Sequence, residues 1–140
     1  MKKNIKFIAL DIDGTIMDKN FHISDRVKIA INNVTQKGVK VVLATGRMYV
    51  ATLPIAKTLQ LTTPLITYHG SLVKDEHHEY IHHKIDKETA LKLISDLRKF
   101  NMQVNICIND ELFSEKETPQ LVQYAKERDL SYNIVKSFES

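Results

Sequence analysis

Two aspartates separated by one residue, Asp11 and Asp13, form the first group of side chains that could do chemistry. They follow the apolar run Ile5–Leu10 and precede Gly14, which lets the chain turn sharply. On an extended segment, residues two apart point to the same side, and repulsion makes it costly to keep both carboxylates ionised. A hard cation such as Mg²⁺ relieves that cost and also binds phosphate oxygens. Taken alone, the pattern favours a plain acidic turn.

Thr45, Gly46 and Arg47 form a second group, directly after the apolar run Val39–Ala44. Taken alone, these residues could form an ordinary turn at the end of a strand. Arg47 could contact phosphate or substrate, or it could pair with a carboxylate at a domain boundary.

The elements around these groups predict that they lie at one edge of a sheet. Buried parallel strands are expected at 5–10, 39–44 and 65–68, because these runs are short, apolar and rich in β-branched residues. Ser24 can cap a helix that Gly38 ends, and another helix should follow Arg47, beginning or kinking at Pro54. This order predicts an α/β fold with a parallel sheet, whose ligand site lies beyond the carboxyl ends of the strands.

The pattern changes in the second half of the chain. A hairpin of 71–73 and 80–82 precedes a helix that Asp86 can cap, with Ala90, Leu93, Ile94 and Leu97 on one face. Paired strands at 103–108 and 111–114 then flank Asn109-Asp110, and Pro119 opens a helix with Leu121, Val122 and Ala125 inward. We therefore expect a second, α+β unit, with residues 1–83 in the first domain and 84–140 in the second.

Together, Asp11-Ile12-Asp13-Gly14-Thr15 and Leu43-Ala44-Thr45-Gly46-Arg47 resemble the first two motifs of haloacid dehalogenase-like phosphatases. The chain looks most like the Cof-type branch (subfamily IIB), in which a large cap domain is inserted after the third core strand. The resemblance is strong to about Gly70 and rests on element order beyond it. It implies a Rossmann-like core followed by the start of an α+β cap.

The resemblance also implies a role for each residue of the two groups. Asp11 would be the nucleophile that forms an aspartyl-phosphate, and Asp13 would donate and accept the proton. Mg²⁺ would be bound by Asp11 and Asp13, and the phosphate by Thr45, Gly46 and Arg47. The implied activity is hydrolysis of a small phosphomonoester, such as a sugar phosphate or phosphorylated cofactor. A phosphomutase and a catalytically silent phosphate-binding fragment are the alternatives.

Two departures from the family pattern stand out. His69-Gly70 follows the third strand where the family usually has Asn-Gly, so His69 could contact substrate or be a plain turn residue. No Gly-Asp pair exists, so the later acidic motif that completes the Mg²⁺ site is absent in its usual form. We therefore expect an incomplete core that needs self-association or a complementing segment.

Composition narrows the remaining possibilities. The net charge is +3, and the basic residues are scattered along the chain, which does not favour nucleic-acid binding. Asp11 and Asp13 interrupt the apolar run near the N-terminus, so we do not expect this run to be a signal peptide or a membrane span. The single cysteine, Cys107, is expected to be a buried thiol in a cytoplasmic protein with no membrane span. The histidine-rich tract 77–83 contains the string His-Glu-x-x-His, but its β-favouring residues predict a solvated hairpin rather than a zinc site.

Overall fold

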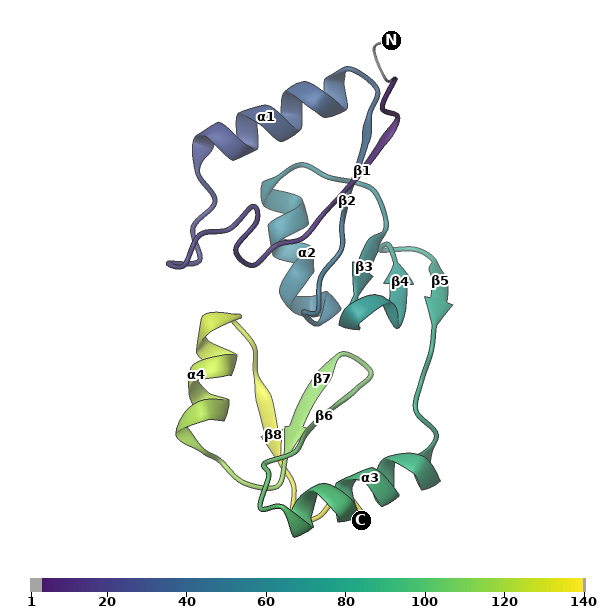
Figure 1. The fold of residues 1–140 in the computed structure, drawn as a ribbon, viewed down its shortest axis with the longest axis vertical. Helices are drawn as coiled ribbons and strands as arrows, with labels where there is room; N and C mark the ends of the chain where they lie inside the picture. The colour runs from purple at the N-terminus through teal and green to yellow at the C-terminus, as the bar shows by residue number, and fades with distance from the viewer. Residues whose placement is uncertain (1–3, 140) are drawn as a thin grey trace. The chain divides into compact units, whose positions relative to one another are not determined.

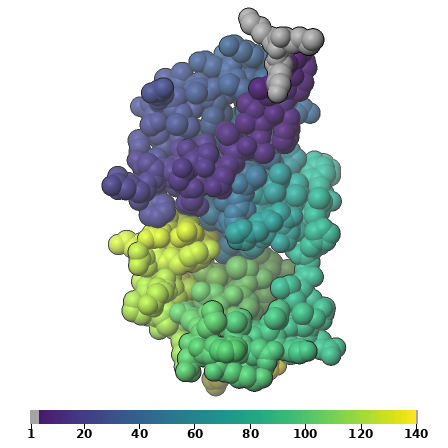
Figure 2. All heavy atoms as spheres, viewed as in Figure 1, coloured from purple at the N-terminus to yellow at the C-terminus, as the bar shows by residue number. Residues whose placement is uncertain are grey.

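The computed structural model describes residues 4–139, and the chain divides into two compact units, residues 1–83 and 84–140. Figure 1 shows the mixed α/β content of the first unit and the helices and short strands of the second. In the space-filling view each unit is a closely packed body, purple to teal for the first and green to yellow for the second (Figure 2). Residues 83–86, which connect them, are exposed and have no regular secondary structure.

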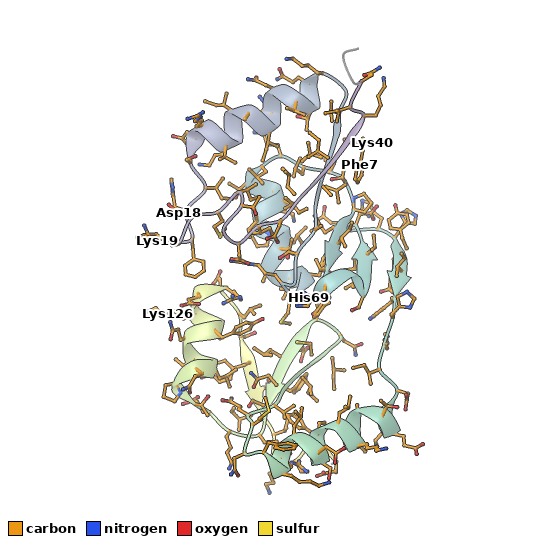
Figure 3. The ribbon with its side chains drawn as sticks, viewed as in Figure 1. Phe7, Asp18, Lys19, Lys40, His69 and Lys126 are labelled. Carbon is orange, nitrogen blue, oxygen red and sulfur yellow. The ribbon has the colours of Figure 1, made fainter. Side chains whose placement is uncertain are left out.

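The first unit is built on the predicted parallel strands. β1 (Phe7–Leu10) pairs in parallel with β2 (Lys40–Leu43), with Phe7 opposite Lys40 and Leu10 opposite Leu43 (Figure 3). β3 (Leu65–Thr67) lies beside the end of β2, where Ala44 and Ile66 form a parallel bridge. The carboxyl ends of all three strands therefore meet at one edge, as the sequence predicts.

Two helices connect these strands. α1 (Asp25–Gln36) begins after Ser24, whose side chain accepts a hydrogen bond from the Val27 N–H, and it ends before Gly38, which has a φ of 80°. Both predicted ends are confirmed. α2 (Tyr49–Thr58) contains Pro54 in its interior, so the expectation that the helix begins at this proline is wrong.

The first unit ends in an antiparallel extension of β3. After the short helix η1 (Tyr68–Gly70), β4 (Leu72–Lys74) pairs with β3, and β5 (Glu79–His82) pairs with β4. All four residues of β5 are exposed. Among residues 4–139 no group of three or more His, Cys, Asp or Glu side chains could hold a metal ion. The pairing of β5 with β4 places residues 79–82 of the histidine-rich tract in the predicted hairpin.

The second unit contains two helices and a three-stranded sheet. α3 (Lys87–Lys99) begins after Asp86, whose carboxylate accepts the Thr89 N–H at 2.9 Å. β6 (Asn105–Ile108) and β7 (Glu111–Ser114) form the expected hairpin, with positive φ at Asn109 and Asp110 in the turn. α4 (Pro119–Glu127) follows, and β8 (Tyr132–Ile134), which the sequence did not predict, pairs in parallel with β7. Ile94, Leu112, Leu121 and Ala125 are buried here.

Several side chains expected to be buried are exposed. Cys107 is exposed because β6 is an edge strand with β7 as its one neighbour, so the expectation of a buried thiol is wrong. Leu93 and Val122 are 47% and 42% exposed, because α3 and α4 bury a narrower stripe than their apolar spacing indicates. No helix within residues 4–139 combines the length and apolarity needed to cross a bilayer.

Candidate active site

The segment that follows β1 turns back on itself and presents both aspartates outward. Ile12 is fully buried, whereas Asp11 and Asp13 on either side of it are exposed, so the two carboxylates lie on the same side of the segment. Gly14, with a φ of 73°, donates its N–H to the Met17 carbonyl at 3.0 Å. The Ile12 carbonyl in turn accepts the Met17 N–H at 3.0 Å. These bonds fix the position of Asp13 relative to the end of β1.

The loop that follows β2 is fixed from both neighbouring strands. The Ala44 N–H donates to the Leu10 carbonyl of β1 at 2.8 Å, and the Thr45 N–H donates to the Ile66 carbonyl of β3 at 2.9 Å. Thr45 is buried, and its hydroxyl oxygen accepts the Arg47 N–H at 3.2 Å. The parallel register thus brings Thr45 to the same edge of the sheet as Asp11.

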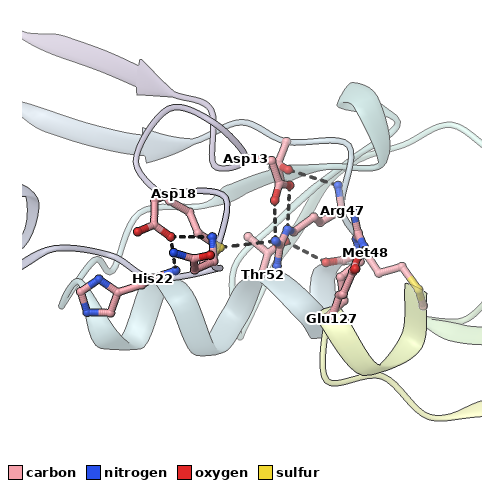
Figure 4. A network of polar contacts seen from close by, with 11 residues as sticks. Asp13, Asp18, His22, Arg47, Met48, Thr52 and Glu127 are labelled. Atoms are coloured by element: carbon pink, nitrogen blue, oxygen red, sulfur yellow. Dashed lines mark hydrogen bonds and ion pairs between the residues drawn. The ribbon is translucent and has the colours of Figure 1, made fainter. Parts of the chain in front are cut away.

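Arg47 joins the two loops directly (Figure 4). Its Nε donates to Oδ2 of Asp13 at 2.8 Å and its Nη2 to Oδ1 at 2.5 Å, a bidentate ion pair between residues 34 positions apart. Arg47 is only 5% exposed, and its Nη2 also lies 3.4 Å from Sδ of Met17. Of the roles open to Arg47 in the sequence, the structure displays pairing with a carboxylate, and that carboxylate is Asp13.

Asp18 organises the rest of the first loop, a role that the sequence analysis missed. Its Oδ1 accepts the N–H groups of Asn20 at 2.8 Å and His22 at 2.9 Å (Figure 4). The hydrogen bond from the His22 N–H, followed by the one from the Asn20 N–H, lowers the pKa of the Asp18 carboxyl below its usual value of 3.8. The signal was available, because aspartate followed two residues later by asparagine favours a turn of this kind.

The donor set at this edge fits Mg²⁺ in part. No hydrogen bond or ion pair engages the Asp11 carboxylate within residues 4–139, so its oxygens are accessible to a ligand. Both carboxylate oxygens of Asp13 are bound to Arg47. Mg²⁺ commonly takes one or two protein oxygens and completes its shell with water and substrate phosphate. The Asp11 carboxylate is suitable as one such protein oxygen.

The match to known proteins extends over almost the whole chain. Residues 8–140 match the model of the family described as haloacid dehalogenase-like hydrolase. The Bacillus subtilis protein YcsE, named 5-amino-6-(5-phospho-D-ribitylamino)uracil phosphatase, is 36% identical over 95 residues, which is 68% of this chain and 38% of YcsE. The B. subtilis phosphatase YwpJ is 26% identical over 130 residues, 92% of this chain and 46% of YwpJ. The chain spans less than half the length of these relatives.

Solved structures agree with these matches. A haloacid dehalogenase-like hydrolase from B. subtilis has a TM-score of 0.83 at 21% identity, over 96% of this chain and 55% of that one, which shows the shared fold. The Thermotoga maritima protein TM0651 has a TM-score of 0.77 at 29% identity, over 94% of this chain and 50% of that one.

Proposed function

Because this chain belongs to the haloacid dehalogenase-like hydrolase family, we propose that it carries the catalytic aspartates of a Mg²⁺-dependent phosphatase. One observation supports this most strongly: the Arg47–Asp13 ion pair draws together the loops after β1 and β2, the two segments that the sequence marks for chemistry. We further propose that residues 1–83 are the N-terminal part of the core and residues 84–140 part of the cap.

In the proposed reaction, Asp11 attacks the phosphorus atom of a phosphomonoester. A bond forms between a carboxylate oxygen and phosphorus while the bond from phosphorus to the ester oxygen breaks, giving an aspartyl-phosphate. Asp13 donates a proton to the departing oxygen and then takes one from the water that hydrolyses the intermediate, which requires that one of its carboxylate oxygens leaves Arg47 and carries the proton. Thr45 and the Gly46 N–H bind phosphate oxygens, and Arg47 holds Asp13 in place. A bound Mg²⁺ would offset negative charge between the nucleophile and the phosphate.

The proposed substrate class is a small phosphorylated metabolite in the cytoplasm, such as a sugar phosphate or phosphorylated cofactor. The name of YcsE, a phosphatase of a phosphorylated ribitylamino-uracil, supports this class. We also propose that the chain associates with itself or with a complementing segment. Among the described strands β1 pairs with β2 alone, and Ile5 and Phe7 are 58% and 54% exposed.

The test is hydrolysis of p-nitrophenyl phosphate with and without Mg²⁺. We expect the wild-type chain to need Mg²⁺, and Asp11→Asn to lose activity by at least about a thousandfold, because the amide cannot act as the nucleophile. Asp25→Asn is the matched control: Asp25 is an exposed aspartate of α1 outside the site. Equal activity in wild type and Asp11→Asn would contradict the nucleophile assignment. Bound phosphate without turnover would favour a silent binding fragment.

A further inference from the structure

The turn after β3 has an unusual backbone. Tyr68, His69 and Gly70 have φ values of 50°, 55° and 93°, so three successive residues lie in the left-handed region. This region is unfavourable for tyrosine and histidine, and such residues stay there only when their surroundings impose it. The surroundings here are the candidate phosphate loop, Thr45–Arg47.

Backbone hydrogen bonds attach this turn to the phosphate loop on both sides of Gly46. The Tyr68 N–H donates to the Arg47 carbonyl at 3.0 Å, and the His69 N–H donates to the Thr45 carbonyl at 3.2 Å. These two hydrogen bonds hold the turn against the loop. The turn therefore fixes the path of the chain through Gly46.

The His69 ring lies directly against Gly46. A Cβ atom added to Gly46 would be 2.3 Å from Cε1, 2.6 Å from Nε2 and 2.9 Å from Nδ1 of that ring. These distances are far below van der Waals contact. Gly46 itself is not in the left-handed region, unlike Gly14, Gly38 and Gly70. Its φ is one that other residues also adopt, so the obstacle to a side chain at this position is the imidazole, which would have to move away.

The groups beside this contact are free to bind an anion. Gly46 is exposed between buried Thr45 and Arg47, and no acceptor for its N–H is present within residues 4–139. The Thr45 hydroxyl oxygen accepts the Arg47 N–H and keeps its own proton to donate. Figure 3 shows His69 on the turn at this edge of the unit.

We propose that His69 is a positioning residue of the phosphate site. Its ring packs against Gly46 and its backbone binds Thr45, which holds the Thr45 hydroxyl and the Gly46 N–H in the arrangement that receives a phosphate. The assignment rests on the proposed function, since it presumes that this loop binds phosphate. It makes positions 46 and 69 a coupled pair: a side chain at 46 displaces the ring at 69, and removal of the ring leaves room for that side chain.

The experiment is a double-mutant cycle with inorganic phosphate as the ligand, in the presence of Mg²⁺. Affinity is measured by isothermal titration calorimetry, and stability by thermal unfolding, for wild type, Gly46→Ala, His69→Gly and the double variant. Glycine at 69 removes the ring and still accepts the left-handed backbone. Gln60→Gly is the matched control, because Gln60 is exposed and has the same φ of 55° but lies outside the site.

We expect Gly46→Ala to weaken phosphate binding about tenfold or more and His69→Gly about threefold, since small displacements of binding groups have large effects. The double variant should bind phosphate more tightly than Gly46→Ala alone, and it should also unfold at a higher temperature. Gln60→Gly should bind as wild type does. A double variant that is weaker than both single variants would overturn the proposal.

The outcomes separate this inference from the proposed function. If wild type binds phosphate but the two substitutions act additively, the role of His69 is wrong and the phosphatase proposal stands. If wild type binds no phosphate, the proposed function fails and the inference fails with it. Rescue of the unfolding temperature without rescue of phosphate binding would show a packing contact only, which also overturns the positioning role.

Discussion

Arg47 has the most constrained environment of any charged residue in the candidate site. Its guanidinium is almost fully buried, while the Asp13 carboxylate that it binds is 42% exposed. The Phe21 ring lies 6.0 Å from the guanidinium carbon, at the limit of a cation–π contact. A buried cation requires a partner, and Asp13 supplies two hydrogen bonds to it. The pair therefore contributes to the stability of the first unit as well as to the arrangement of the site.

The strength of this pair can be measured with a double-mutant cycle of Arg47→Ala and Asp13→Ala by urea unfolding. Because Asp13 can regain water when its partner is removed, we expect a coupling energy of about 1–2 kcal/mol, below the ~3–5 kcal/mol lost when a fully buried pair is broken. The exposed pair Lys28–Asp25 on α1 is the control and should give about 0.5 kcal/mol or less. Equal coupling in the two pairs would show that burial of Arg47 adds nothing.

At the residue scale the sequence identified the groups but not their contacts. It predicted that Asp13 and Arg47 lie near each other, because each follows a strand of the same parallel sheet. Whether Arg47 reaches a carboxylate or a phosphate depends on side-chain conformation, which motif spacing does not encode. The contact between His69 and Gly46 could not be predicted from the sequence either. It depends on a left-handed turn, and the sequence Tyr-His-Gly does not indicate such a turn.

The β4–β5 hairpin is an element whose turn depends on one carboxylate. Asp75 accepts the N–H groups of His77 and His78, each at 2.8 Å, and the Tyr80 hydroxyl at 2.7 Å. The hydrogen bond from the His77 N–H, followed by those from Tyr80 and His78, lowers the pKa of Asp75 from 3.8 to about 2. The ionised carboxylate is therefore the form that the hairpin binds.

This predicts a stability difference with a definite pH range. A carboxyl group whose pKa is lower in the folded state stabilises the fold above its unfolded pKa of 3.8, and this contribution disappears as pH falls to about 2. Asp75→Asn should therefore lower the unfolding temperature at pH 6 and much less at pH 2. Thermal unfolding across this range measures the difference, with Tyr80→Phe as a variant that removes a single donor. A pH-independent difference would exclude the charged form as the cause.

At the element scale the sequence performed well where local chemistry determines the outcome. The caps at Ser24 and Asp86, the proline that opens α4 and the Asn109-Asp110 turn were all predicted, because each depends on a few adjacent residues. β8 was missed because its three residues are too few for an alternating pattern to indicate a strand. It is a strand through its parallel pairing with β7, a contact distant in sequence. The exposure of Leu93 and Val122 is likewise determined by tertiary packing rather than by their spacing along the helices.

At the scale of the whole molecule, the most important feature is the outer edge of β1, which pairs with no other strand among the described residues. The Lys40 N–H donates to the Lys6 carbonyl and the Ala44 N–H to the Leu10 carbonyl, so even-numbered residues of this strand face β2. By the alternation of a parallel ladder, the backbone groups of Phe7 and Ala9 face the other way. An edge with exposed backbone groups and apolar neighbours such as Ile5 favours pairing with another chain.

We therefore expect the chain to self-associate at micromolar concentration, and sedimentation equilibrium to give a mass that rises with concentration. Ala9→Pro should shift the population toward monomer, because proline removes the N–H on the outer side of β1 without removing a bond to β2. Ile29→Gln is the control: it replaces an exposed apolar side chain of α1, 60% exposed, and should leave the mass unchanged. If Ile29→Gln dissociates the assembly and Ala9→Pro does not, association proceeds through apolar side chains of α1. A wild-type chain that stays a non-exchanging monomer would show that the β1 edge does not pair at all.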